Sequence, residues 1–175
     1  MAQKARGEFN AWLMKIIRDL FLIIIFIGLL QNFMQRDMRS GAVADLAFKT
    51  ISGEDSAKLL ANKPAIIYFW GSWCAICAAI QGTISEVLHD YSGVTVALRS
   101  GSNANVLSYM QKNNLNWQVI NDNDGALAES FGVSAVPAVF ILGSDGKISF
   151  VTLGYVTEIG LRVRLWWLTS VYWVG

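Results

Sequence analysis

The hydrophobic residues of this chain form one long unbroken run near the N-terminus, followed by shorter runs and periodic stretches. Leu20–Gln35 contains no charged residue, and its first part, Leu20–Leu30, is apolar throughout. A membrane-spanning helix needs about 20 residues, a length that this run reaches if Trp12–Ile17 extends it upstream. We therefore predict a transmembrane anchor with a short tether in residues 1–40 and a separate domain in residues 41–175.

Basic residues around the apolar run predict its orientation in a membrane. More of them precede the run than follow it closely, and the positive-inside rule places the richer side in the cytoplasm. Those before the run are Lys4, Arg6, Lys15 and Arg18, and those after it are Arg36 and Arg39. We expect a single-pass protein of the inner membrane of a Gram-negative bacterium, with the C-terminal domain in the periplasm. A cleaved signal peptide ending near Ala42–Ala44 is the alternative, and it also exports the domain.

The domain after the anchor alternates between apolar runs typical of strands and stretches with helical spacing. Ala65–Trp70 is a continuous apolar and aromatic run, which is typical of a central strand buried on both faces. The other predicted strands are Val94–Leu98, Trp117–Ile120, Ala138–Leu142 and Ile148–Leu153. The predicted helices are Cys74–Leu88, Asn103–Gln111, Ala126–Phe131 and Glu158–Leu168. This order predicts an α/β fold with a mixed central sheet, antiparallel strands added by a hairpin through Ser144–Lys147, and helices on both faces.

Composition narrows the class of protein and the kinds of site that it can hold. Apolar residues make up 54% of the 175 residues and charged residues 15%, which excludes a disordered chain and agrees with a membrane segment. The net charge of +1 gives no general reason to expect nucleic-acid binding. Two cysteines and one histidine cannot complete a zinc site of four cysteines, a zinc site of two cysteines and two histidines, or a multi-disulfide scaffold. The positions of the two cysteines are therefore informative.

Both cysteines lie at the junction of a predicted strand and a predicted helix, in the segment Trp73-Cys74-Ala75-Ile76-Cys77. A thiol at a helix N-terminus meets unpaired backbone N–H groups and the positive end of the helix dipole, which favour the thiolate. Cys77 follows one turn later on the same face, within reach of a disulfide. The pair predicts a reversible dithiol with Cys74 as the accessible nucleophile and Cys77 as its resolving partner. A two-thiolate Cu(I) site and a purely structural disulfide are the alternatives that the spacing leaves open.

Several segments of the exported domain resemble one known family. Ala65–Cys77, with the sequence AIIYFWGSWCAIC, resembles the strand, WC-x-x-C motif and helix of the thioredoxin superfamily. Ser134–Phe140 resembles its second signature, a loop with a cis-proline, and Gly143–Ile148 resembles its hairpin. Phe48–Gly53 is similar to the hairpin that opens the membrane-anchored TlpA/DsbE-like branch. The resemblance implies a thioredoxin-like fold over nearly the whole exported domain, with most similarity to the suppressor of copper sensitivity D family.

The same resemblance implies a protein-disulfide oxidoreductase whose only redox group is its own Cys74–Cys77 disulfide, with no cofactor and no metal. A cis bond before Pro137 would expose the Val136 backbone to a client strand beside the pair, and Trp73 would shape the substrate surface. The branch implies a reductase of periplasmic client proteins that a transmembrane thiol donor of the DsbD type re-reduces. Its pathway would be copper tolerance or cytochrome c maturation, and an oxidase or isomerase is the alternative direction.

Two departures from the family pattern concern the charge beside the dithiol. Thioredoxin has a buried aspartate six residues before its first motif cysteine, where this chain has Tyr68. TlpA-like reductases often carry a glutamate shortly after the motif, where this chain has Ala78–Gln81. The nearest downstream acid, Glu86, is expected on a solvated helix face. No obvious buried acid is therefore present to deprotonate Cys77, and the direction of electron flow rests on the resemblance.

The C-terminal end of the chain is unusually apolar and aromatic. The predicted last helix has an apolar face of Ile159, Leu161, Leu165 and Leu168. The further aromatic residues are Trp166, Trp167, Tyr172 and Trp173. We expect this excess to complete the core or to belong to the chain end, and contact with a bilayer or a membrane partner is the alternative. Trp70 and Trp117 are also expected in the core.

Overall fold

The computed structural model describes residues 12, 14–23, 25–26, 41–42, 48–62 and 64–171. The chain divides into two compact units, Met1–Asp37 and Met38–Gly175. In the first unit, residues 14–23 are helical. Within the described ranges, no helix is both long and apolar enough to cross a membrane. Much of the predicted anchor, residues 27–40, lies outside these ranges, and the anchor stays a prediction.

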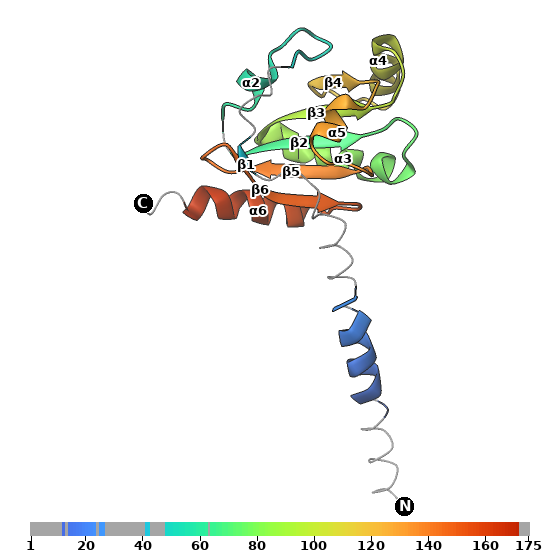
Figure 1. The fold of residues 1–175 in the computed structure, drawn as a ribbon, viewed down its shortest axis with the longest axis vertical. Coiled ribbons are helices and arrows are strands. Elements are labelled where there is room, and N and C mark those ends of the chain that lie inside the picture. The colour runs from blue at the N-terminus through green and yellow to red at the C-terminus, as the bar shows by residue number, and fades with distance from the viewer. Residues whose placement is uncertain are drawn as a thin grey trace, which may run out of the picture. The chain divides into compact units, whose positions relative to one another are not determined.

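The described strands of the second unit form one mixed sheet (Figure 1). They are β1 (Gly41–Ala42), β2 (Ala65–Trp70), β3 (Ser92–Leu98), β4 (Val119–Asp122), β5 (Ala138–Leu142) and β6 (Lys147–Leu153). Their order across the sheet is β1-β6-β5-β2-β3-β4. β2, β3 and β4 are parallel, whereas β5 pairs antiparallel with both β2 and β6, and β1 pairs antiparallel with β6. β2 therefore lies between a parallel and an antiparallel neighbour.

Helices cover both faces of this sheet, as predicted. They are α2 (Ser56–Leu59), α3 (Ala75–Asp90), α4 (Asn103–Lys112), α5 (Ala126–Ser130) and α6 (Glu158–Val171). One core contains Ile66, Tyr68 and Trp70 of β2 together with side chains of α3, α4 and α6. The other contains Ile67 and Phe69 of β2 together with side chains of α5. Because successive side chains of a strand point to opposite faces, β2 contributes to both cores and is buried along its whole length.

The predicted strands and helices are confirmed in kind, with shifts at some ends. The strands predicted over Ala65–Trp70 and Ala138–Leu142 have the predicted bounds. β4 begins at Val119 rather than at Trp117, because its pairing with β3 starts opposite Thr95. Trp117 precedes the strand, and its ring is buried in the core as expected. The alternation of apolar runs and helical spacing thus predicted which segments are strands and helices more accurately than it predicted where each of them begins and ends.

α6 is apolar on two opposite faces, and only one of them belongs to the core. Leu161, Leu165 and Leu168 are buried, and Val156 just before the helix packs with them. Ile159, which was predicted on this face, is instead 76% exposed. With 3.6 residues per turn, Ile159 shares the outer face with Val163 and Trp166, so its assignment to the core was wrong.

The expectation that the C-terminal aromatic residues complete the core is also wrong for two of them. Trp166 and Trp167 are 61% and 57% exposed on α6. The helix continues to Val171 instead of ending at Leu168, which extends the exposed face. Tyr172 and Trp173 lie outside the described residues. The outer face of α6 is therefore an apolar and aromatic surface of the second unit.

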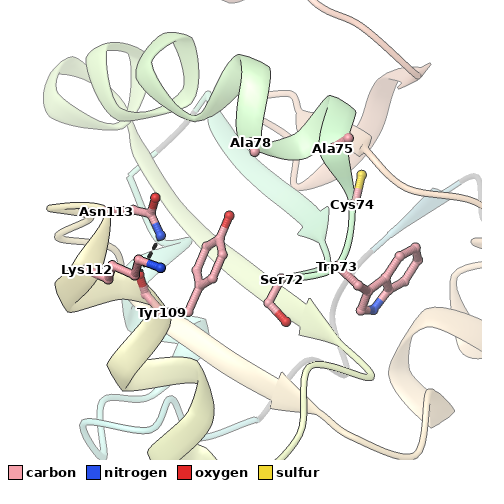
Figure 2. Close-up of a pocket in the computed structure, with 8 residues that line it drawn as sticks. All are labelled: Ser72, Trp73, Cys74, Ala75, Ala78, Tyr109, Lys112 and Asn113. Carbon is pink, nitrogen blue, oxygen red and sulfur yellow. Dashed lines mark hydrogen bonds between the residues drawn. The ribbon is translucent and has the colours of Figure 1, made fainter.

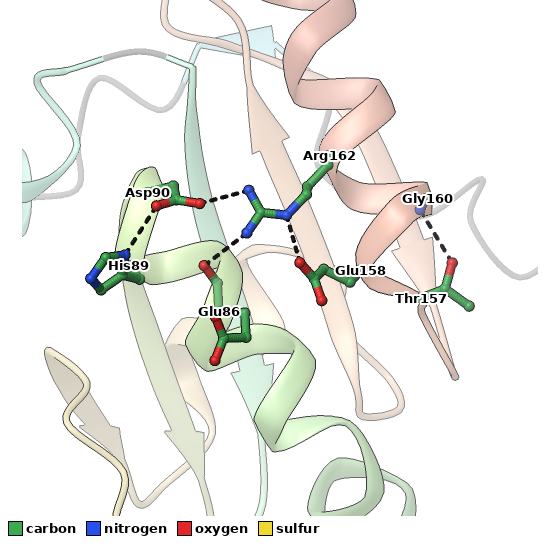
Figure 3. Close-up of polar contacts among 7 residues, drawn as sticks. All are labelled: Glu86, His89, Asp90, Thr157, Glu158, Gly160 and Arg162. Carbon is green, nitrogen blue, oxygen red and sulfur yellow. Dashed lines mark hydrogen bonds and ion pairs between the residues drawn. The ribbon is translucent and has the colours of Figure 1, made fainter.

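Arg162 of α6 fastens this helix to the end of α3 (Figure 3). Its guanidinium donates to Glu158 Oε1 and Asp90 Oδ2 at 2.7 Å each, and to the carbonyl oxygen of Glu86 at 3.3 Å. Hydrogen bonds from His89 and Arg162 lower the pKa of Asp90, and the bond to Asp90 raises the pKa of His89. These groups are solvated, so they specify how the helices meet more than they stabilise the fold.

The two faces of α6 should respond differently to truncation. Leu165→Ala removes a fully buried side chain and should lower the free energy of unfolding by about 2–5 kcal/mol. Trp166→Ala, its neighbour on the exposed side, should change that free energy by less than about 0.5 kcal/mol. Urea denaturation followed by circular dichroism measures both values. A loss of similar size in both variants would contradict the assignment of the two faces.

Candidate active site

The end of β2 fixes the position of both cysteines. The strand is buried to its last residue, Trp70, and the chain then turns through Gly71 and Ser72 before α3 begins at Ala75. The turn is fastened to the loop after β3, because the Ser72 N–H donates to Ser100 Oγ at 3.0 Å. A rigid central strand thus ends in a short, hydrogen-bonded turn that delivers Cys74 to the start of a helix.

Gly71 and Trp73 fit together within this turn. The Trp73 indole N–H donates to the carbonyl oxygen of Leu98 at 3.2 Å, which holds the ring across the turn. A Cβ atom at Gly71 would lie 2.6 Å from the indole, so the ring can take this position only over a glycine. Trp73 is nevertheless 61% exposed, and its place on a substrate surface stays a prediction.

Cys74 and Cys77 form a disulfide at the N-terminus of α3. Cys74 is the N-cap residue of the helix, and its Sγ accepts a hydrogen bond from the Cys77 N–H at 3.1 Å. The Cα atoms are 5.2 Å apart, within the usual range for a disulfide. Cys77 is the more deeply buried of the two, with 3% exposure against 8% for Cys74. The helix N-terminus is thus built to hold negative charge on Cys74 once the pair is reduced.

The loop before β5 lies directly against Cys74. The peptide bond between Val136 and Pro137 is cis, as the resemblance implied. Cys74 Sγ lies 3.6 Å from the carbonyl oxygen of Val136. The Pro137 carbonyl oxygen accepts from the Gly154 N–H at 2.8 Å, which ties the loop to the end of β6. The structure therefore brings all five predicted site residues together at the carboxyl end of β2, and Val136 stays partly accessible there. They are Trp73, Cys74, Cys77, Val136 and Pro137.

Aromatic side chains lie in the core that contains the two cysteines, and Tyr68 among them occupies the position at which thioredoxin has a buried aspartate. Tyr68 packs edge-on against Trp117, with ring centroids 5.8 Å apart, and Trp70 packs against both Trp117 and Tyr109. Among the described residues, the buried Tyr68 hydroxyl has no hydrogen-bond partner. Burial raises the pKa of the Tyr68 phenol, so it stays neutral. Glu86 is exposed on α3, as predicted.

A cavity of about 320 Å³ opens beside Cys74 (Figure 2). Its lining joins the start of α3 to the end of α4, and consists of Ser72, Trp73, Cys74, Ala75, Ala78, Tyr109, Lys112 and Asn113. The three lining residues from α4 and its C-terminal cap, Tyr109, Lys112 and Asn113, were not predicted from the sequence. No local motif marks them, because only the packing of α4 against the sheet brings them near the cysteines. In the part of the chain that the structure describes, no group of three or more histidine, cysteine or acidic side chains is placed to hold a metal ion.

The chain matches a known family and is similar in sequence to proteins of other bacteria. Residues 36–151 match the model of the AhpC/TSA family. A thioredoxin-like protein of Haemophilus influenzae is 34% identical over 150 residues, which cover 84% of this chain and 89% of the relative. The sporulation thiol-disulfide oxidoreductase A of Bacillus subtilis is 26% identical over 83% of this chain and 94% of its own length.

Solved structures are similar to this chain as well, and one of them is similar in both sequence and fold. It is the crystal structure of a secreted Mycobacterium tuberculosis disulfide oxidoreductase described as homologous to E. coli DsbE. The two chains share 31% sequence identity with a TM-score of 0.62, over 73% of this chain and all of the other. The thioredoxin-like fold implied by the sequence motifs is therefore confirmed.

The partnerless hydroxyl of Tyr68 predicts the effect of removing it. Because a buried polar group without a partner lowers stability, Tyr68→Phe should leave the free energy of unfolding unchanged or raise it by about 1 kcal/mol. The rate at which the reduced pair reacts with a disulfide should also stay unchanged. Denaturant unfolding and a stopped-flow exchange assay measure the two quantities, and Tyr155→Phe, at an exposed tyrosine, is the control. A loss of stability or rate in Tyr68→Phe alone would mean that the hydroxyl is in use.

Proposed function

Because the chain belongs to the AhpC/TSA family and is a thioredoxin-like thiol-disulfide oxidoreductase, we propose that it is a membrane-anchored reductase of disulfides in periplasmic client proteins. The observation that carries this proposal is the Cys74–Cys77 pair at the N-terminus of α3, beside the Val136–Pro137 loop. The arrangement offers a sulfur nucleophile, a second sulfur within bonding distance and an accessible backbone edge for a client strand.

The reaction proceeds by two thiol-disulfide exchanges. The Cys74 thiolate attacks one sulfur of the client disulfide, so that a mixed disulfide forms, the client S–S bond breaks and one client thiolate leaves to take up a proton. The Cys77 thiolate then attacks Cys74 Sγ, which forms the Cys74–Cys77 disulfide and releases the second client thiolate. The client gains two electrons and the pair loses two. The Cys77 N–H that points at Cys74 Sγ supports the negative charge on this sulfur before attack.

Anchoring and compartment rest on the sequence. The uncharged run of residues 20–35 and the basic residues before it favour an inner-membrane helix with a periplasmic domain. A transmembrane thiol donor of the DsbD type would then return two electrons to Cys74–Cys77 after each cycle. The reductive direction follows from similarity to the DsbE-like branch. A role in copper tolerance, as in the suppressor of copper sensitivity D protein, rests on the sequence resemblance alone.

Trapping of the mixed disulfide tests the mechanism. Cys77→Ser keeps the nucleophile and removes the resolving thiol, so client proteins should accumulate in disulfide linkage to Cys74. Cys74→Ser should form no such adducts above the level of the variant that lacks both cysteines. Non-reducing electrophoresis of membranes from cells that express the full chain, with and without dithiothreitol, measures the adducts. If neither single variant forms adducts, or if Cys74→Ser forms more of them, the assigned roles are wrong.

The redox state in cells tests the direction of electron flow. A reductase must be held as the dithiol, so Cys74 and Cys77 of the wild-type chain should be mostly reduced when cells are quenched with acid. Alkylation with a mass-tagging reagent reports the fraction of reduced thiols. The same measurement after chemical oxidation and after reduction calibrates the two end states. A pair that is mostly oxidised would overturn the reductive direction and favour an oxidase.

A further inference from the structure

We propose that the cavity beside Cys74 binds a carboxylate of the disulfide substrate, close to the sulfur that Cys74 attacks. The inference rests on the proposed exchange reaction and adds a class of substrate to it. The cavity is well placed for this role, because Cys74 itself lines it while Cys74 Sγ also approaches the Val136 carbonyl oxygen. A substrate joined to Cys74 through sulfur can therefore extend into the cavity without leaving the Val136–Pro137 loop.

The charge of the cavity is positive and unbalanced. Of the described residues that line it, Lys112 alone is charged, and none carries a carboxylate. Within the described part of the chain Lys112 forms no ion pair, whereas Arg162 and Lys147 both do. The N-terminus of α3 borders the opposite side of the cavity, and in the reduced protein its partial positive charge is compensated by the Cys74 thiolate. An anionic group of the substrate would therefore meet the uncompensated charge of Lys112.

The walls of the cavity suit a side chain that ends in a carboxylate. Figure 2 shows the Tyr109 ring between Lys112 and the start of α3, where Ala75 and Ala78 present only methyl groups. The ring is held in place, because it packs on Trp70 with centroids 5.4 Å apart. The Asn113 side-chain amide donates to the Tyr109 carbonyl oxygen at 2.8 Å, which fixes the end of α4 next to Lys112. Methyl groups and an aromatic ring in the lining, together with one cation, suit a side chain that has an apolar stem and ends in a carboxylate.

A lysine at the end of a helix also has an ordinary explanation, namely compensation of the helix dipole. Lys58 occupies the same kind of position in the last turn of α2 and is exposed, but it lines no part of this cavity. The two lysines therefore share a local setting and differ in their distance from the chemistry. Lys58→Gln is for this reason the matched control for Lys112→Gln.

The test measures how fast the reduced full-length chain reacts with peptide disulfides that differ at one position beside the cysteine. The peptides carry aspartate, asparagine or lysine at this position, on either side of the cysteine, and oxidation of Cys74–Cys77 is followed in single turnover. At low ionic strength, wild type should react about two- to fivefold faster with the aspartate peptide than with the asparagine peptide, as expected for one solvated charge pair. The preference should vanish in 1 M salt, where the screening length falls to about 3 Å.

The variants decide whether Lys112 is responsible. Lys112→Gln should bring the ratio of the aspartate rate to the asparagine rate to about one. Lys112→Glu should lower this ratio below one and make the lysine peptide react fastest. Lys58→Gln should keep the wild-type ratio. A preference that survives in Lys112→Gln overturns the inference and leaves the proposed function standing. Equal wild-type rates with all three peptides do the same when the rate with glutathione disulfide is also independent of Lys112. A wild-type chain that reacts with none of the peptides overturns the proposed function itself.

A small disulfide could supply the same carboxylate chemistry as a client side chain. Glutathione disulfide, which carries its own carboxylates, serves as this arm of the experiment and is compared with a neutral disulfide such as oxidised 2-mercaptoethanol. A Lys112-dependent preference within the peptide set assigns the carboxylate to client proteins. A Lys112-dependent rate with glutathione disulfide, and with no acidic peptide, keeps the anion site and assigns it to small disulfides.

Discussion

The burial of β2 on both faces is the constraint on which the rest of this structure depends. Its residues Ala65–Trp70 are buried without exception, between a parallel and an antiparallel neighbour and below helices on both sides. Hydrogen-bonded neighbours along both edges and packed side chains on both faces hold this strand in one register. The turn after Trp70 therefore leaves the sheet at a fixed point, and Cys74 begins α3 at that point. The antiparallel pairing with β5 brings the Val136–Pro137 loop to the same edge.

Much of this arrangement is local in sequence, and that part could be predicted. A continuous apolar run identifies β2. The cysteines follow it closely, at the N-cap and in the first turn of α3, so their place in the fold needs no long-range information. The Val136–Pro137 loop is distant in the chain and could be placed only through the resemblance. The contribution of Tyr109 and Lys112 could not be foreseen, because α4 carries no motif and reaches the cysteines only through packing. The assignment of Ile159 to the core was wrong for a related reason. When a helix is apolar on two faces, its sequence does not show which of them enters the core.

The chemistry of the site follows from where charge is absent as well as from where it is present. The core beside the dithiol is aromatic. Burial raises the pKa of the Tyr68 hydroxyl in this core, so the hydroxyl stays neutral. The charge at the surface is cationic, through Lys112 and the start of α3. An anionic nucleophile is thus stabilised at the outer cysteine and is given no acidic competitor from the described lining of the cavity. Lys112, which lines the cavity beside Cys74, supplies the charge that would attract an anionic substrate toward the sulfur that attacks it.

The depth of the two sulfurs bears on the direction of electron flow. Stabilising a thiolate on Cys74 stabilises the reduced pair, and taken alone it would make the protein a better oxidant. Cys77 is 3% exposed and belongs to an apolar core with Tyr68 and Trp70. A buried sulfur without a charged partner resists ionisation, so its burial acts on the second exchange, in which Cys77 must lose its proton to attack Cys74 Sγ. The only buried acid among the described residues, Asp122, accepts hydrogen bonds from the Leu127 and Ala128 N–H groups instead. The helix N-terminus at Cys74 thus acts on the potential of the pair, whereas the burial of Cys77 acts on the rate at which a mixed disulfide is resolved.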